Sequence, residues 1–174
     1  MFTTLAIIAA VLVAAVLVSA ARKPGTFRVH RTRIIHAGPR KIVPLIEDFH
    51  AWRSWSPYEK LDPTMKKALS GAAKGKGAVY AWEGNARAGA GRMEIIDASS
   101  SQVTIKLDFI KPFQGHNVAE FTLEPRSGST NVTWTMYGPS SFLAKVVTTF
   151  FSMDRLVGRD FETGLANLKA IAEA

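Results

Sequence analysis

The stretch that decides the fold is "FTLEPRSGSTNVTWTMYG", residues 121–138, in which two alternating runs flank a short polar segment. Phe121 and Leu123 alternate with polar residues in the first run, and Trp134 and Met136 do so in the second. This period of two is typical of a β-strand with one buried face. The intervening "PRSGST" is rich in residues that favour turns. The stretch therefore predicts an antiparallel hairpin.

The same alternation extends upstream of the hairpin. Together the runs cover residues 79–83, 92–96, 103–109, 119–124 and 131–137. Five such runs joined by short polar segments predict an antiparallel meander with one apolar face.

Three other segments complete the first half of the domain. Residues 27–35 predict a further strand whose basic residues suit an edge or a solvated face. A short or two-part helix should follow Pro39, disturbed by Pro44 and ending before Pro57. Residues 61–76, which contain four lysines and several small residues, are expected to form a loop.

A long helix is predicted to close the domain. Residues 142–172 contain no proline and keep apolar residues at helical spacing. At about 1.5 Å per residue, a helix of roughly 30 residues would be about 45 Å long. It is the only predicted element large enough to cover the apolar face of the sheet. Gly158 and Gly164 interrupt it and can mark a bend or a close approach to the sheet. The fold class is therefore α+β.

The first 21 residues differ from the rest because they contain no charged side chain, glycine or proline. As a helix they would span roughly 31 Å, close to the bilayer's hydrocarbon thickness of about 30 Å. We expect a transmembrane anchor over residues 1–21 and a basic linker over residues 22–26. Val18-Ser19-Ala20 would also suit signal-peptide cleavage. No basic residue precedes the apolar run, which favours an anchor.

The charge distribution points to a membrane surface. Residues 22–41 contain seven Lys or Arg and no acidic residue, within a chain of net charge +8. Such a segment beside an apolar span predicts contact with anionic lipid headgroups. The positive-inside rule predicts a single-pass protein with a cytoplasmic domain. After cleavage the domain would instead be periplasmic or secreted. No nucleic-acid-binding motif accompanies the basic residues, so nucleic acid is not an expected partner.

The order of elements and three sequence motifs resemble the SRPBCC superfamily, which includes START, polyketide cyclase/dehydrase and pollen-allergen proteins. The motifs are "HAGPRKIVPLIEDFHAWRSWSP", "FTLEPRSGSTNVTWTMYG" and "GRDFETGLANLKAIAE". They are most similar to the bacterial polyketide cyclase and lipid transport branch. The resemblance implies a helix-grip fold over residues 27–174, with a curved antiparallel sheet wrapped around the C-terminal helix and a cavity for an apolar ligand. It implies no particular reaction.

The inner surface of this grip supplies the candidate ligand-binding site. Methionine adapts to ligands of different shape, and tyrosine and tryptophan combine apolar area with a polar group. The same side chains could instead form a filled core, which would suit a partner-binding module. The candidate site consists of Trp52, Trp55, Tyr80, Trp82, Met93, Ile95, Phe109, Phe121, Trp134, Met136, Phe150, Met153 and Phe161.

The sequence offers little for catalysis. The chain has no cysteine, and its four histidines form no metal-binding pattern, so neither a metal nor a cofactor is expected. His50 follows Asp48 and is a weak candidate for a general base. The strand carboxylates fall on the polar face, which leaves the cavity side nearly free of titratable groups. We therefore expect a carrier of an apolar small molecule or lipid without chemistry of its own; the alternative is a cyclase/dehydrase-type enzyme.

The segment "FHAWRSWSPYEK", residues 49–60, is unusually aromatic. Helical spacing lets Phe49, Trp52 and Trp55 share one face, and Pro57 then turns the chain away. The tryptophans either complete the core as a plug or act as a gate at the cavity entrance. Complete enclosure of Trp55 would identify a plug.

Overall fold

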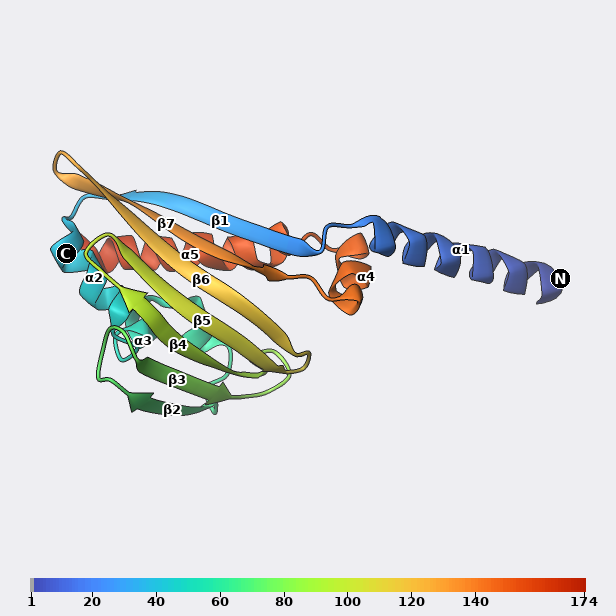
Figure 1. Cartoon of the computed structure of the whole chain (residues 1–174), viewed down its shortest axis with the longest axis horizontal. Coiled ribbons are helices and arrows are strands. Elements are labelled where there is room, and N and C mark those ends of the chain that lie inside the picture. The colour runs from blue at the N-terminus through green and yellow to red at the C-terminus, as the bar shows by residue number, and fades with distance from the viewer. Residues whose placement is uncertain (1) are drawn as a thin grey trace.

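The computed structural model describes residues 2–174, so the first residue of the expected anchor lies outside it. Helix α1 precedes a seven-stranded antiparallel sheet, two short α-helices and a 3₁₀ helix lie between the first two strands, and two helices follow the sheet (Figure 1). The elements are α1 (Phe2–Arg22), β1 (Thr26–Ile35), α2 (Pro39–Glu47), α3 (Trp52–Trp55), η1 (Pro57–Lys60), β2 (Lys66–Gly71), β3 (Ala78–Glu83), β4 (Ala90–Ala98), β5 (Gln102–Lys111), β6 (Gly115–Arg126), β7 (Ser129–Pro139), α4 (Phe142–Phe150) and α5 (Met153–Ala172).

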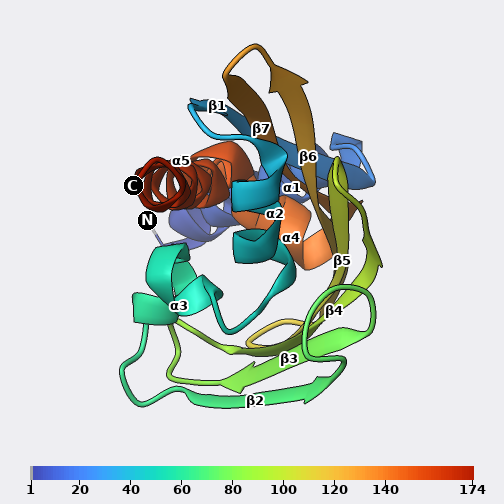
Figure 2. The same ribbon diagram turned by 90° about the vertical axis from the view of Figure 1, so that its left-hand side faces the viewer.

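The sheet has the order β1-β7-β6-β5-β4-β3-β2 and curves around α5, as the end view shows (Figure 2). Five consecutive hairpins join β2 to β7, and β1 pairs with β7 at the other side. The hairpin predicted over residues 121–138 forms between β6 and β7, with Phe121 opposite Trp134. This is the helix-grip arrangement, and all five predicted alternating runs are strands of it.

Trp134 lies at the centre of the contact between the sheet and α5. Its indole stacks on Phe161 of α5 at 4.1 Å between ring centroids and on Phe121 of β6 at 4.9 Å. A Cβ atom at Gly164 would lie 2.7 Å from Cζ3 of this indole. Glycine at this position therefore allows the helix to approach the ring so closely. The expectation that Gly164 marks a close approach is confirmed.

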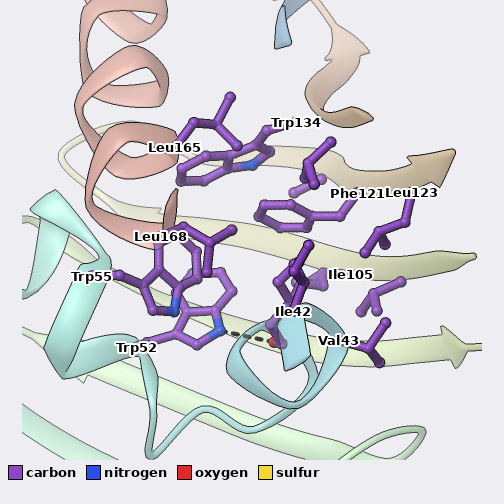
Figure 3. Packing of buried hydrophobic residues seen from close by; sticks show 14 of the residues in the cluster. Ile42, Val43, Trp52, Trp55, Ile105, Phe121, Leu123, Trp134, Leu165 and Leu168 are labelled. Carbon is purple, nitrogen blue, oxygen red and sulfur yellow. Dashed lines mark hydrogen bonds between the residues drawn. The ribbon is translucent and has the colours of Figure 1, made fainter. Parts of the chain in front are cut away.

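One end of the grip is packed solid. Here α2 packs against β5, β6 and α5, and α3 packs against α5. Both helices add side chains to the core, and Trp52 donates through Nε1 to the Ile46 carbonyl at 2.9 Å (Figure 3). The most enclosed residues of this end are at most 3% exposed, which indicates close packing. They include Ile35, Ile42, Ile46, Trp52, Trp55, Ile95, Val103, Ile105, Phe121, Leu123, Val132, Leu165 and Leu168.

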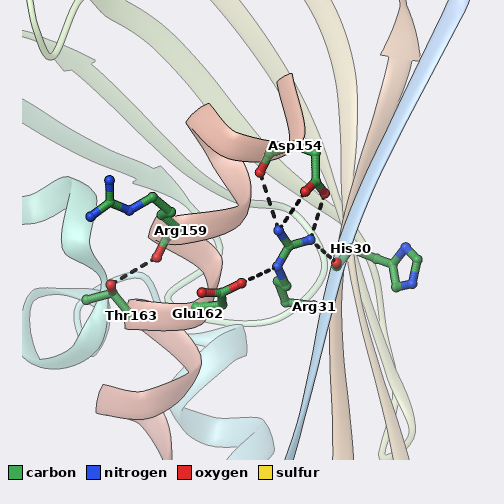
Figure 4. A network of polar contacts seen from close by, with 6 residues as sticks. All are labelled: His30, Arg31, Asp154, Arg159, Glu162 and Thr163. Atoms are coloured by element: carbon green, nitrogen blue, oxygen red, sulfur yellow. Dashed lines mark hydrogen bonds and ion pairs between the residues drawn. The ribbon is translucent and has the colours of Figure 1, made fainter. Parts of the chain in front are cut away.

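A charge cluster holds β1 against α5. The Arg31 guanidinium donates to Asp154 Oδ1 at 2.7 Å and to Glu162 Oε1 at 2.5 Å (Figure 4). A Cβ at Gly158 would lie 2.1 Å from Arg31 Nη2, so this glycine provides the space that the guanidinium occupies. The Arg31 hydrogen bonds hold the pKa of Asp154 below its ordinary value.

Two sequence-based expectations are wrong in part. Residues 66–71, expected to lie in a loop, form the exposed edge strand β2, whose lysines and small residues conceal a strand pattern. The single long helix is two helices, because Phe151 and Ser152 adopt extended backbone. Ser152 precedes Asp154 in the first turn of α5, a combination that favours a helix start.

The contribution of the central stack can be measured by removing one ring. Phe161→Ala should lower the free energy of unfolding by about 3–5 kcal/mol, because Phe161 is 1% exposed and its loss leaves a cavity. Phe142→Ala is the matched control, since Phe142 is 53% exposed and its loss should leave stability nearly unchanged. Denaturant unfolding of the full chain in detergent, followed by near-ultraviolet circular dichroism, gives both values. Equal stability of the two variants would contradict the central role of the stack.

Candidate ligand-binding site

A pocket of about 320 Å³ lies between the sheet and α5. Most of its lining is apolar, and among its lining residues Arg87 on the β3–β4 connection is exposed. A mostly apolar cavity with a few polar groups is typical of small-molecule sites. The lining residues are Trp52, Ser56, Tyr58, Glu59, Leu61, Met65, Tyr80, Trp82, Arg87, Ala88, Met93, Leu107, Phe109, Ala119, Trp134, Met136, Val157, Asp160 and Phe161.

The pocket occupies the end of the grip from which α1 leaves. The strand registers place the β3–β4 and β5–β6 connections at the same end as the start of β1 and the end of β7. Pocket residues sit close to these strand ends, as Trp82 does on β3, Phe109 on β5 and Met136 on β7. The opposite end is filled by side chains of α2 and α3, and Trp52 of α3 borders the cavity where the filled part ends.

Eight of the thirteen candidate residues line the pocket. Sequence alternation places the strand members on the concave face, and Phe161 and Trp52 face them from the helices. The eight are Trp52, Tyr80, Trp82, Met93, Phe109, Trp134, Met136 and Phe161.

Five candidate residues lie elsewhere. Trp55, Ile95 and Phe121 are at most 1% exposed and belong to the filled end of the core. Met153 packs against the core without lining the pocket. The prediction that Phe150 faces the sheet is wrong, because the break after it places Phe150 on the separate helix α4, where it is 65% exposed.

The two tryptophans of the aromatic segment take different positions. Trp55 is 1% exposed, and its Nε1 donates to the Leu45 carbonyl at 2.8 Å. It does not border the pocket and is therefore a plug. Trp52 lines the pocket, but it too is fixed by packing and by the hydrogen bond to Ile46.

The expectation that the cavity side is nearly free of titratable groups is wrong. The strand carboxylates do stay off the pocket, but Tyr58, Glu59 and Asp160 line it from η1 and α5. Strand alternation could not reveal them, because they belong to helical segments. The sequence did contain one indication of Asp160, because this residue directly precedes Phe161, which was predicted to line the site.

Glu59 is held in the pocket wall by two donors. Tyr80 Oη donates to Glu59 Oε1 at 2.6 Å, and the Lys67 ammonium donates to the other carboxylate oxygen. The Glu59 side chain is 8% exposed, so both bonds compensate a buried charge. Burial, followed by the bond to Glu59, raises the pKa of Tyr80 above its ordinary value. Tyr80 is therefore a neutral donor fixed in place.

Asp160 has no such partners. Within residues 2–174 its carboxylate forms no hydrogen bond or ion pair with another side chain. Burial raises the pKa of Asp160, and Arg159 opposes this shift only in part. Burial also raises the pKa of Tyr58, and the charge of Asp160 adds to that shift. The pocket thus contains an unpaired acid beside a phenol that stays protonated.

Two further polar atoms at the pocket wall lack partners. Among the described residues, the Trp134 Nε1 and the Ser56 Oγ are buried without a hydrogen bond. Both residues line the pocket. Buried polar groups in proteins are normally satisfied, so these two atoms are exceptions. Both atoms have almost no accessible surface, so neither faces the open space of the pocket.

Comparison with known families and structures agrees with this geometry. The family model described as polyketide cyclase / dehydrase and lipid transport matches residues 26–173. The chain belongs to this family. No curated protein matches the chain.

Solved structures show the same fold as this polyketide cyclase / dehydrase and lipid transport family member. Protein CV1439 from Chromobacterium violaceum is 15% identical, with a TM-score of 0.59, and the match covers 87% of this chain and 99% of that one. The Aha1 dimer from Colwellia psychrerythraea is 16% identical, with a TM-score of 0.57 over 84% and 96% of the two chains. The di-domain ARO/CYC StfQ from the steffimycin biosynthetic pathway is 8% identical, with a TM-score of 0.65 over 85% of this chain and 51% of that one.

His50 lies outside the pocket of this family member. Its Nδ1 is 2.8 Å from Asp48 Oδ1, and its side chain is 63% exposed. The pair is a surface contact, and neither residue lines the cavity described above. Within residues 2–174 the pocket wall contains two acids, and because Glu59 is paired, Asp160 is the unpaired one.

The raised pKa of Asp160 predicts a pH-dependent effect on stability. Because burial disfavours the ionised form, the native state loses stability as the pH rises through the raised pKa. Asp160→Asn should therefore be more stable than the wild type at pH 7, and this advantage should disappear below the ordinary Asp pKa of about 3.9. Denaturant unfolding at pH 7 and pH 3.5 measures it. Asp97→Asn, at an exposed position, is the control, and a less stable Asp160→Asn at pH 7 would contradict the prediction.

Proposed function

We propose that this chain is a membrane-anchored binding protein that holds an apolar small molecule or lipid in the pocket between the sheet and α5. The observation that carries the proposal is the position of the pocket, whose lining residues lie toward the end of the grip from which α1 leaves. With α1 in a bilayer, the opening lies on the membrane side of the domain. The family description, which includes lipid transport, supports this class of ligand.

The lining suits a ligand with an apolar body and one polar group. Trp82, Phe109 and Met136 present apolar surface, while Tyr58 and Asp160 present polar groups on the helical side. A ligand hydroxyl could donate to the Asp160 carboxylate and accept from a protein donor such as Tyr58. A hydrocarbon without a polar group would leave the Asp160 charge desolvated, which is unfavourable.

The membrane anchor is part of the proposal. Helix α1 has 21 residues and is apolar enough to cross a membrane; a signal sequence would pass the same test. The basic residues that follow would contact anionic headgroups, and the domain from residue 27 onward would be cytoplasmic by the positive-inside rule. Protease digestion of sealed cells and of inverted vesicles tests this arrangement, because a cytoplasmic domain is cleaved only in the inverted vesicles.

The ligand can be sought directly. The full chain is purified in a mild detergent from the membranes in which it is expressed, and bound molecules are extracted and identified by mass spectrometry. Recovery of one class of apolar molecule in a stoichiometric amount relative to the protein supports the proposal. Full chain that carries none and does not take up an apolar fluorophore would contradict it.

Filling the pocket should abolish binding without unfolding the protein. Ala119 is 4% exposed and lines the pocket, so the ring of Ala119→Phe would extend into space that the ligand needs. We expect the Kd for an apolar fluorophore to rise at least tenfold, equivalent to about 1.4 kcal/mol. Ala98→Phe adds the same ring near the filled end of the core and is the control. Similar Kd values for the two variants would show that the fluorophore binds elsewhere.

A second candidate function is an enzyme of the cyclase/dehydrase kind. The specific observation that favours it is Asp160, an unpaired acid with a raised pKa in an apolar pocket, since such groups are typical of acid–base catalysis. Asp160→Asn separates the two candidates. An enzyme would lose turnover of an added polyketide-like substrate by about 10²–10⁴-fold while still binding it. A carrier would show no turnover in either form.

A further inference from the structure

Helix α4 has an inverted distribution of polar and apolar residues. Leu143, Val147 and Phe150 share one stripe at helical spacing, and they are 39–65% exposed. The opposite stripe contains Lys145, Thr148 and Thr149, which are half-buried. A surface helix of a water-soluble domain normally has the reverse arrangement, with its apolar face inward. The environment outside α4 is therefore one that accepts apolar side chains.

The polar face of α4 is turned toward the end of α1. Lys23, the residue after α1, donates through Nζ to the Thr148 carbonyl and also to Thr148 Oγ1 at 3.3 Å. Ala20 of α1 is completely buried, and α1 packs against α4. Helix α4 thus lies across the end of the body at the place where α1 leaves it (Figure 1).

A second apolar protrusion lies at the same end. In the β5–β6 hairpin, Ile110 is 53% exposed and Phe113 is 61% exposed. The register of β6 with β7 places this turn level with Pro139 and hence with the start of α4. It also lies beside Phe109, which lines the pocket.

The charges around these elements suit an anionic surface. Residues 22–46, 109–119 and 140–153 contain no Asp or Glu, whereas each of the three ranges contains at least one Lys or Arg. Glu83, close to the β5–β6 turn, is paired with Lys111 at 2.8 Å. The combination of exposed aromatic residues with basic ones is typical of segments that lie in a membrane interface.

We propose that α4 and the β5–β6 turn form a lipid-contact surface that inserts into the headgroup region of the same bilayer that α1 crosses. The inference rests on the proposed anchor. The bilayer is the occupant of this apolar surface because α1, an apolar helix of transmembrane length, packs on α4 itself. Insertion would set the pocket opening directly against the lipid from which a ligand enters.

The absence of cysteine in the chain makes site-specific labelling unambiguous. Single-cysteine variants of the full chain are labelled with an environment-sensitive fluorophore and reconstituted in vesicles of phosphatidylcholine and phosphatidylglycerol that contain quencher-bearing lipids. Val147→Cys, Phe150→Cys and Phe113→Cys report the proposed surface. Leu12→Cys reports α1, and Leu69→Cys is the matched control, an exposed apolar position on β2.

The expected result is strong quenching at positions 147, 150 and 113, quenching at position 12, and none at position 69. Quenching at position 12 alone would overturn the lipid-contact surface while leaving the anchor intact. No quenching at position 12 would overturn the anchor, and with it the proposed function as stated. Quenching at position 69 as well would indicate a domain that lies flat on the bilayer, which would also overturn the inference.

A functional measurement provides a second test. The double variant Phe113→Gln/Phe150→Gln changes no pocket residue and should leave the Kd for an apolar fluorophore in detergent unchanged. Transfer of the fluorophore between vesicles and the reconstituted protein should slow at least tenfold, because the opening no longer reaches the lipid. Leu69→Gln/Ile96→Gln removes two exposed apolar residues elsewhere and is the control. Equal transfer rates for both double variants would contradict the inference.

Discussion

The stacking of Trp134 on Phe161 is the contact on which the rest of the domain depends. It fixes the distance between sheet and helix, and Gly164 permits that distance by having no side chain. Aromatic rings stacked in this way contribute beyond their buried area. Because the rings lie at the middle of the grip, they also separate its two halves. On one side α2 and α3 complete a solid core, and on the other the space between sheet and helix stays open.

The open half makes the domain less stable than a completely filled core would, because a cavity lacks packing contacts. The same half contains the unpaired Asp160 and the unsatisfied Trp134 Nε1 and Ser56 Oγ. Cavity and unpartnered polar groups therefore coincide in one region of the domain. A bound molecule that fills the space and pairs with Asp160 would offset the lost packing and the unpaired charge, and stability and ligand occupancy would then be linked by mass action.

The sequence predicted β3 to β7 well because alternation in these strands is strict. Six of the eight strand residues that line the pocket were among the candidates, and Leu107 and Ala119 were missed. The sequence could not predict which half of the concave face would be filled, since that depends on how far α2 and α3 extend over the sheet. Alternation placed Ile95 and Phe121 on the same apolar face of the sheet as Met93 and Met136. Only Met93 and Met136 border the cavity. The helix break at residues 151–152 was missed because apolar spacing continues across it, and this moved Phe150 away from the site.

The short connection between α1 and β1 limits how the domain can work. Helix α1 ends at Arg22 and β1 begins at Thr26, so three residues, which span at most about 11 Å, join them. Lys23 is in addition tied to α4. With α1 in a bilayer, the domain cannot swing out to a second membrane or follow a soluble partner. Direct exchange of its contents with lipid would then take place with the membrane that α1 crosses.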